Sequence, residues 1–179
     1  FTPESILALT FTNKAANEMK DRIKELIGKK ADDLWMGTFH SVFAKILRIE
    51  AKHINYKSNF SIYDTIDSLS LVSNIMTDLN IDSDNISSNS VRHRISFLKN
   101  YMISPQEFRS KHVGSFLEEK ITDVYVEYQK RLVEFNAMDF DDLLLKPIEL
   151  FNDKKNILQK YKSRFEYLLV DEFQDTNKA

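Results

Sequence analysis

The sequence predicts an α/β protein, in which a partial parallel sheet is interrupted by an all-helical insertion. Residues 1–50 alternate short apolar runs with segments of helical periodicity, which is typical of parallel α/β sheets. Residues 64–135 carry only apolar stripes of helical spacing. An apolar run returns at residues 167–170 and ends at two adjacent carboxylates, Asp171 and Glu172. We therefore expect one sheet assembled from both ends of the chain.

The amino-terminal part of the chain supplies the first predicted strands and helices. The apolar run at residues 6–10 is suited to a fully buried strand. The helix that follows has one apolar face, and Gly28 is placed to cap its end. Residues 34–36 form a second short strand before Gly37, and another helix begins after Thr38. The apolar faces of the two helices contain Ala16, Met19, Ile23, Leu26 and Ile27, and then Phe39, Phe43, Ile46 and Leu47.

The middle of the chain has the pattern of helices, and we expect no strand there. The stripes that predict helices cover residues 64–79, 90–102 and 115–135. Another helix begins at Ser104 and Pro105, because a capping hydroxyl precedes proline at the first helical position. Serine and asparagine gather within residues 82–90, which we expect to form a loop.

The chain returns to the sheet through a helix that begins near Asp139. Asp141 and Asp142 lie in its first turn, where the helix dipole favours acidic groups. Pro147 removes one backbone hydrogen bond inside this helix, so we expect a kink or a break there. A further helix near residues 154–163 precedes the last strand. We place the α/β part at residues 1–52 and 138–179, and the helical insertion at residues 53–137.

The composition excludes several classes of protein. The chain has 179 residues, no cysteine and a net charge of −2, so it forms no disulfide and no thiolate metal site and lacks an overall basic character. The histidines lack the spacing of a zinc site. No apolar stretch reaches the roughly 18 residues of a membrane span, and the amino terminus does not resemble a signal peptide. We expect a cytoplasmic protein. The basic residues of the stretch 91–112, which either touch phosphates or form a solvated helix face, are Arg92, Arg94, Lys99, Arg109 and Lys111.

The acidic run after the last apolar segment carries the clearest chemistry. A strand with a buried end that stops at two carboxylates is the layout that holds magnesium and activates water in nucleotide hydrolases with a glycine-rich phosphate loop. Successive side chains of a strand point to opposite faces, so we expect Asp171 and Glu172 to leave the strand in different directions. The alternative is an ordinary buried strand followed by an acidic turn, and Asp175 and Thr176 fit a role in shaping that turn.

Four stretches together resemble the superfamily 1A DNA helicases, the UvrD/Rep/PcrA group, in order and in spacing. Residues 8–16 resemble motif Ia of that family, residues 37–41 motif Ib, residues 138–143 the acidic element after the inserted domain 1B, and residues 171–176 motif II. The resemblance covers essentially the whole chain. It implies a partial RecA-like core of a P-loop NTPase, domain 1A, which is interrupted by the helical domain 1B.

The resemblance also implies roles for particular residues, with ATP and Mg²⁺ as cofactors. Asp171 is the expected magnesium ligand, Glu172 the general base that activates water, and Gln174 the residue that senses the γ-phosphate. The residues expected to contact DNA follow two strand ends: Thr10, Phe11, Thr12, Asn13, Thr38, Phe39, His40 and Ser41. Phe11 is expected to stack on a base. Without the resemblance, Phe11 would be read as a core aromatic and His40 as a capping or core histidine.

Half of a nucleotide site is absent from the sequence. It contains no Gly-x-x-x-x-Gly-Lys-Ser/Thr, so the phosphate loop, its lysine and its metal-binding hydroxyl are missing. The family places that loop just before the first residue, and its second RecA-like domain after the last. We therefore expect a fragment without ATPase activity of its own. We also expect an exposed sheet edge that favours self-association or partial disorder near residues 165–179.

The function that these features imply is that of an ATP-dependent 3′-to-5′ DNA helicase or translocase, acting on single-stranded and duplex DNA. One alternative is a non-catalytic module whose helical part binds DNA or a protein. Another is a helicase–nuclease of the same superfamily. A Gly-Lys-Ser/Thr loop in the sequence upstream of residue 1 would favour the enzyme over the module.

Overall fold

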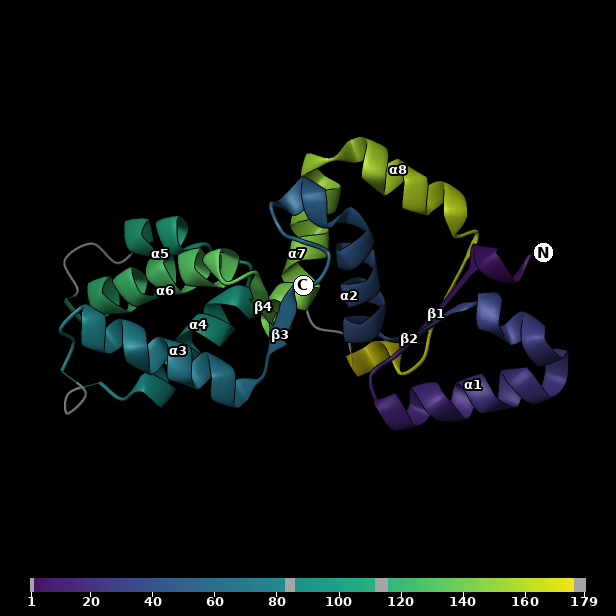
Figure 1. The fold of residues 1–179 in the computed structure, drawn as a ribbon, viewed down its shortest axis with the longest axis horizontal. Helices are drawn as coiled ribbons and strands as arrows, with labels where there is room; N and C mark the ends of the chain where they lie inside the picture. Colours follow the sequence, from purple (N-terminus) through teal and green to yellow (C-terminus); the bar gives the residue numbers. More distant parts are fainter. Residues whose placement is uncertain (1, 83–85, 112–115, 176–179) are drawn as a thin grey trace. The chain divides into compact units, whose positions relative to one another are not determined.

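The structure is a computed structural model that describes residues 2–82, 86–111 and 116–175. The chain forms two compact units. The helices and strands of both units are labelled in Figure 1. Unit 1 comprises Phe1–Glu50 and Lys146–Asn177, and unit 2 comprises Ala51–Leu145. Most described residues are helical, and the strands among them form two short parallel sheets. The fold is therefore mixed α/β, in agreement with the predicted class.

Unit 1 consists of a parallel sheet and the helices around it. Its strands are β1 (Ile6–Thr10), β2 (Trp35–Thr38) and β5 (Tyr167–Val170), in the order β2-β1-β5. Its helices are α1 (Asn13–Ile27), α2 (Phe39–Glu50), α8 (Lys155–Arg164) and, from Lys146 on, the end of α7 (Phe140–Asp153), with 3₁₀ turns at Pro3–Ser5, Gly28–Asp33 and Phe173–Asp175. The predicted order of strands and helices is confirmed at both ends of the chain.

The core of unit 1 forms around the central strand β1 and the helix α2. The buried apolar residues of these two elements are Leu7, Ala8, Leu9, Val42, Ala44, Ile46 and Leu47. Trp35 of β2 is also buried, and its ring centre lies 6.3 Å from that of Tyr161 and 5.3 Å from that of Phe165. Lys45 and Arg164 place their cationic groups 4.0 and 4.7 Å from the centre of the Trp35 ring. These aromatic and cation–π contacts attach α8 to β2.

Two elements of unit 1 are more exposed than their sequence pattern predicts. None of the residues of α1, all of which the structure describes, is buried, and Leu26 on its apolar face is 83% exposed. In β5, Leu168 and Leu169 are 62% and 58% exposed. The expectation that residues 167–170 form a buried strand is therefore wrong in this chain. Leu168 and Leu169 point to opposite faces of the sheet, so the described residues cover neither face at β5, which lies at the sheet edge and pairs with β1 alone among the described strands.

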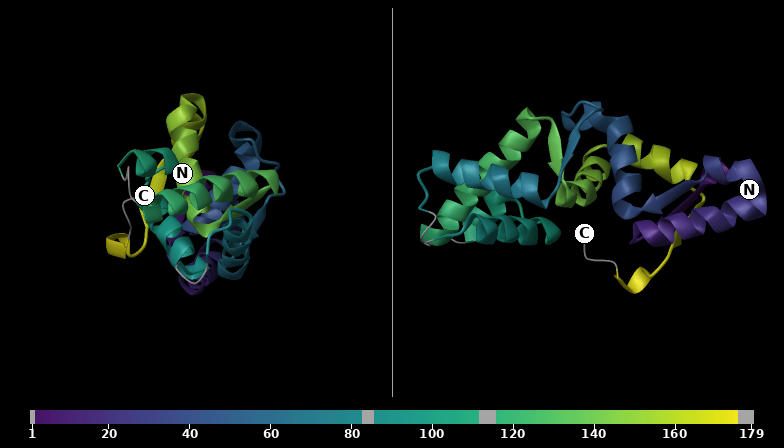
Figure 2. Two further views of the ribbon diagram at one scale, coloured as in Figure 1. Left: turned by 90° about the vertical axis from the view of Figure 1, so that its left-hand side faces the viewer. Right: turned by 60° about the horizontal axis from the view of Figure 1, so that its bottom comes forward.

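Unit 2 is a group of helices around an apolar core (Figure 1, with two further views in Figure 2). Its elements include α3 (Thr65–Asp78), α4 (Ser88–Asn100), α5 (Pro105–Lys111), α6 (Phe116–Glu134), a 3₁₀ turn at Ala51–Ile54 and the start of α7 (Phe140–Asp153). The predicted stripes are buried in their middles, for example at Val72, Ile95 and Val124. The ends of the stripes are not buried as predicted, because Leu79, Met102 and Leu117 are 37%, 52% and 47% exposed.

Within the described residues, unit 2 also contains two strands that the sequence pattern does not predict. β3 (Ser61–Tyr63) and β4 (Ala137–Asp139) pair in parallel, with Ile62 opposite Met138. The prediction of an all-helical insertion is therefore wrong. Each strand has three residues, which is too short for an alternating apolar pattern to be recognised.

The helix boundaries follow the capping residues closely. Asp64 Oδ1 accepts hydrogen bonds from the backbone N–H groups of Ile66 and Asp67 at 2.7 and 2.9 Å, which starts α3. Ser104 Oγ accepts from the N–H of Glu107 at 3.1 Å at the start of α5. Gly28 ends α1 with a φ of 63°, a conformation that glycine adopts without strain. The helix α7, described throughout, continues past Pro147 to Asp153, so the predicted break does not occur.

Candidate functional site

The residues predicted to carry function meet at one edge of the unit 1 sheet. The strands are parallel, so their carboxyl ends lie at the same edge. Thr10 lies opposite Thr38 across β1 and β2, and Leu9 lies opposite Val170 across β1 and β5. The segments that follow these strand ends therefore lie next to one another: residues 10–13, 38–41 and 171–174. Open parallel α/β sheets bind their ligands outside this edge.

The segment after β1 leads directly into α1. Thr10 is buried at the end of the strand, and Asn13 is the exposed first residue of the helix. Thr12 caps the helix, because its side chain accepts a hydrogen bond from the N–H of Ala15 at 3.1 Å. The amino terminus of α1, with its free N–H groups and positive dipole end, consequently lies at the sheet edge.

The segment after β2 depends on a close approach between Gly37 and α2. A Cβ atom at Gly37 would lie 2.4 Å from Oγ of Ser41, so a larger residue would displace that side chain. The Ser41 hydroxyl donates to the carbonyl oxygen of Thr38 at 2.9 Å, and the Ser41 N–H donates to Thr38 Oγ1 at 3.2 Å. His40 is half-buried and engaged in a contact within the fold. These contacts hold the start of α2 against the end of the strand.

Three phenylalanines form a row along this edge. The ring centre of Phe39 lies 5.1 Å from that of Phe11 and 6.0 Å from that of Phe43. All three side chains are half-buried, so each ring packs on the fold and keeps part of its surface open to solvent. Phe11 is therefore neither a fully buried core aromatic nor a free side chain. A partly exposed aromatic row of this kind offers flat apolar surface to a ligand.

Asp171 and Glu172 follow β5 in an exposed turn. The N–H of Asp171 donates to the carbonyl oxygen of Leu9 at 2.9 Å, which attaches the turn to the end of β1. The side-chain amide of Gln174 donates to Glu172 Oε2. The expectation from strand alternation does not hold, because β5 ends at Val170 and Glu172 has a φ of 53°. The turn, rather than the pleat of the strand, sets the directions of the two carboxylates. Thr176 lies outside the described residues.

The donor set at this edge suits a magnesium ion shared with a substrate. The described residues contain no group of three or more His, Cys, Asp or Glu side chains that could hold a metal ion. Mg²⁺, however, is commonly bound by one or two carboxylates together with water and substrate phosphates. Asp171 and Glu172 are exposed at a strand end, which fits that mode of binding.

A separate question is whether any helix could span a membrane. Among the described residues, none of the helices combines the length and the apolar character that a membrane span needs.

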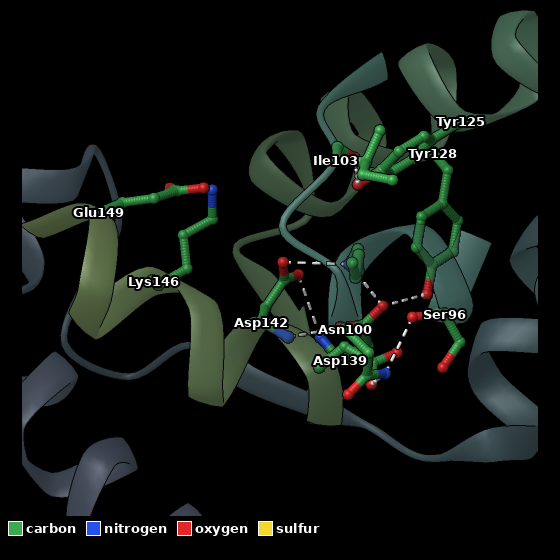
Figure 3. A network of polar contacts seen from close by, with 11 residues as sticks. Ser96, Asn100, Ile103, Tyr125, Tyr128, Asp139, Asp142, Lys146 and Glu149 are labelled. Carbon is green, nitrogen blue, oxygen red and sulfur yellow. Dashed lines mark hydrogen bonds and ion pairs between the residues drawn. The ribbon is translucent and has the colours of Figure 1, made fainter. Parts of the chain in front are cut away.

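A buried ion cluster in unit 2 was not predicted from the sequence. Lys99 is 1% exposed, and its Nζ lies 2.7 Å from Asp139 Oδ2 and 3.0 Å from Asp142 Oδ1. The Tyr128 hydroxyl donates to Asp139 at 2.9 Å, and the Asp142 N–H donates to Asp139 Oδ1 at 2.8 Å (Figure 3). The interpretation of Lys99 as a surface cation is therefore wrong. Its position four residues after Ile95, on the buried stripe of α4, is the signal that could have revealed it.

Mutual attraction keeps Lys99 and Asp139 charged despite their burial. Burial lowers the pKa of Lys99, but the carboxylates of Asp139 and Asp142 outweigh burial and leave that pKa raised. Burial raises the pKa of Asp139, but the ammonium group of Lys99 outweighs it and leaves that pKa lowered. Burial and then the charge of Asp139 raise the pKa of Tyr128, so its hydroxyl remains a donor. The other oxygen of Asp139, Oδ1, holds the first turn of α7 by accepting from the N–H of Asp142.

The fold and this edge define a known class of protein. The family described as UvrD/REP helicase N-terminal domain matches residues 1–179. The chain therefore belongs to the UvrD/REP helicase N-terminal domain family, and the recognition made from four sequence motifs is confirmed.

Particular relatives agree with this assignment. The ATP-dependent DNA helicase PcrA of Bacillus subtilis (strain 168) is 44% identical to this chain over 177 residues. The proteins of the same name from Staphylococcus epidermidis and Staphylococcus aureus (strain Mu50) are 42% and 40% identical over 178 residues. In each case the match covers 99% of this chain and 24% of the relative. The chain thus spans about a quarter of the length of these relatives.

Proposed function

We propose that this chain supplies part of an ATP-dependent DNA helicase or translocase. In this proposal it contributes the carboxylates of the ATP site and a track for single-stranded DNA. The observation that supports the proposal is the convergence of residues 10–13, 38–41 and 171–174 on one sheet edge. Coupling nucleotide chemistry to movement on DNA requires that both sites be built on shared, rigid elements. The relatives named ATP-dependent DNA helicase PcrA suggest the same class of activity.

On the nucleotide side, Asp171 and Glu172 have different roles in this proposal. Asp171 would hold Mg²⁺ together with the phosphates of ATP, and the ion would supply positive charge beside those phosphates. Glu172 orients the attacking water and accepts its proton, as a general base in contact with solvent. Gln174 donates to Glu172, so it positions that carboxylate in addition to sensing the γ-phosphate. Because the sequence has no Gly-Lys-Ser/Thr loop, we expect no ATP hydrolysis by these 179 residues alone.

On the DNA side, the aromatic row and the two helix starts have complementary roles. Phe11 and Phe39 offer surface for stacking, which contributes ~1–3 kcal/mol per base and does not depend on sequence. The amino termini of α1 and α2 offer N–H groups to phosphate oxygens. Thr12 and Thr38 hold these helix ends in place through the hydrogen bonds described above. The remaining predicted contacts belong to the same two segments: Thr10, Asn13, His40 and Ser41.

The division of the chain into two units supports a proposal about its domains. We infer that unit 1 is part of a RecA-like domain 1A and that unit 2 is the inserted domain 1B. The first observed division, after Glu50, lies near the predicted start at residue 53, whereas the second, after Leu145, lies beyond the predicted end at residue 137. The 3′-to-5′ direction, the unwinding of duplex DNA and a cytoplasmic location belong to the same proposal. The family match over the whole chain favours a helicase over a separate binding module, and a helicase–nuclease remains an alternative within it.

The test measures binding of a labelled oligothymidine to this chain and to Phe11→Ala over a range of salt concentrations. We expect Phe11→Ala to weaken binding about tenfold, which corresponds to ~1.4 kcal/mol and the loss of one stacking contact. The slope of affinity against salt should not change, because the phosphate contacts remain. Phe135→Ala is the matched control, since Phe135 is 56% exposed in unit 2 and has no proposed role.

The outcomes separate stacking from a structural role. Equal affinity of Phe11→Ala and the unaltered chain would contradict a DNA contact at Phe11. A loss accompanied by a shallower salt slope would assign the effect to phosphate contacts instead. Equal losses in Phe11→Ala and Phe135→Ala would show a general effect of removing an aromatic ring.

A further inference from the structure

Unit 2 contains a cavity of about 130 Å³ that none of the roles above uses. Residues of β3, α3, α4, α6 and α7 line it, among them Tyr63, Asp64, Arg92 and Asp141. Its volume is far above the roughly 10–15 Å³ that a single water molecule needs. Asp64 at its wall is exposed, so the cavity is accessible from solvent. The start of α3 and the start of α7 both contribute to its walls.

Arg92 is the unusual residue of this cavity. Its side chain is half-buried, and its Nε is fully buried without a hydrogen-bond acceptor in the described part of the chain. Its Nη2 lies 3.2 and 3.4 Å from the two ring nitrogens of His93. The guanidinium has no carboxylate partner among the described residues. Buried donors are nearly always paired, so an unpaired one beside a cavity points to an acceptor that enters from outside.

The other basic residues of the same stretch behave differently. Each has a carboxylate partner within unit 2: Arg94 with Glu118 at 3.0 Å, Lys99 with Asp139 at 2.7 Å, Arg109 with Asp123 at 2.6 Å, and Lys111 with Glu107 at 2.7 Å. Their charges are therefore neutralised by the fold itself. Arg92 is the exception in residues 91–111, and it is also the one of these five that lines the cavity.

The cavity offers acceptors as well as this donor. Asp64 uses Oδ1 to cap α3, and Asp141 uses Oδ1 to accept from the side-chain amide of Asn100 at 2.9 Å. Each keeps its second carboxylate oxygen, for which the described residues supply no donor. Tyr63 adds an aromatic wall. A ligand that suits these groups is flat and neutral, with an acceptor for Arg92 and an amine for a carboxylate.

We propose that this cavity binds an unstacked nucleobase of single-stranded DNA, with Arg92 donating to a base acceptor and Asp64 or Asp141 accepting from an exocyclic amine. The inference rests on the proposed function, which makes DNA the polymer that the chain meets. A phosphate suits the cavity less well, because the carboxylates of Asp64 and Asp141 line it and repel an anion. Cytosine combines the required amine with ring acceptors, whereas thymine has no exocyclic amine.

The experiment compares two labelled oligonucleotides of equal length, one of deoxycytidines and one of abasic sites. Both carry the same backbone charge, so the ratio of their affinities reports contacts to bases alone. We expect Arg92→Met to weaken binding of the deoxycytidine oligomer about fivefold and to leave the abasic oligomer unchanged, which is at the lower end of a single base contact. Arg92→Lys keeps the charge but lacks Nε, and it should show the same selective loss.

Arg109→Met is the matched control, because Arg109 lies in the same stretch, is exposed and does not line the cavity. Arg92→Met and Arg92→Lys both remove Nε, which has no acceptor among the described residues, and an exposed contact of Nη2 with His93, so neither should lower the thermal midpoint appreciably. Equal weakening of both oligomers by Arg92→Met would make Arg92 a phosphate contact and overturn the base site. If Arg92→Met bound both oligomers as tightly as the unaltered chain does, the cavity would hold only water, and the base site would also be overturned. Failure of the unaltered chain to bind either oligomer would overturn the proposed DNA binding of this chain together with the base site.

Discussion

Both units of this chain leave some large apolar side chains exposed, but the buried apolar core of unit 2 is the larger of the two. Unit 2 closes around its core, where Val72, Val124 and Leu132 are fully buried and Lys99 is enclosed with its carboxylate partners. Unit 1 buries its central strand but leaves Leu168 of β5 and Leu26 of α1 largely exposed. Buried apolar area is the main source of folding stability. We infer that unit 2 carries most of the stability, whereas unit 1 carries the sheet edge on which the proposed chemistry depends.

The largest expected effect is in the ion cluster of unit 2. Lys99→Met leaves Asp139 and Asp142 buried without their cation, and breaking a buried pair in this way costs about 3–5 kcal/mol. Urea denaturation followed by circular dichroism measures the change in the free energy of unfolding. Lys111→Met, which removes an exposed pair with Glu107, is the control and should cost at most about 1 kcal/mol. Similar costs for the two variants would contradict the special role of the buried cluster.

A pair of leucine substitutions compares the two units directly. Leu132→Ala in the core of unit 2 should cost about 2–5 kcal/mol, because Leu132 is completely buried. Leu168→Ala in β5 should change stability by no more than about 0.5 kcal/mol, because Leu168 is 62% exposed. The measurement is again urea denaturation. A large cost for Leu168→Ala would mean that β5 is covered in solution.

The exposed edge strand β5 of unit 1 should also affect whether copies of the chain associate. We propose that β5 of one copy associates with another, since exposed apolar edge strands recruit partners. Leu168→Lys should then reduce self-association in sedimentation velocity, because charged side chains protect sheet edges. A monomeric chain before and after the substitution would contradict this proposal.

The pH dependence of stability should also reflect unit 2. The pKa of Asp139 is lowered in the folded state, so its contribution is present above the unfolded value of about 3.9 and is lost as the pH falls through the folded value. The pKa of Lys99 is raised, so its contribution is complete below about 10.4 and is lost only as the pH rises through the folded value. Urea titrations at pH 7 and pH 3 measure the free energy of unfolding. Between these two pH values, that free energy should fall less for Asp139→Asn than for the unaltered chain. An equal fall would place the acid sensitivity elsewhere.

The smallest expected effect is in the carboxylates of unit 1. Glu172→Gln should leave ATP turnover by this chain unchanged at the background rate, because the sequence has no phosphate-binding lysine loop. It should also leave stability nearly unchanged, because Glu172 is exposed. A phosphate-release assay with both proteins measures this. Turnover that Glu172→Gln abolishes would contradict the proposal that the chain alone is inactive.

Local signals in the sequence were sufficient for most helices and for the sheet of unit 1. Apolar runs placed β1 and β5 at residues 6–10 and 167–170, and Asp64 and Ser104 marked two helix starts. Such signals act over a few residues, so they are legible without knowledge of the rest of the fold. The four motifs were enough to recognise the family, because their order and spacing are specific.

Other features depend on residues that are distant in the chain, and the sequence did not reveal them. The pairing of β3 with β4, the contact of Lys99 with Asp139, and the exposure of the leucine side chains of β5 each depend on which segments become neighbours. Helical periodicity shows which face of a helix is buried, but it does not show which charged residue of another segment lies opposite that face. The apolar pattern of an edge strand is likewise the same whether or not a neighbour covers it. Amphipathic order is a property of one segment, whereas burial and ion pairing belong to pairs of segments brought together by folding.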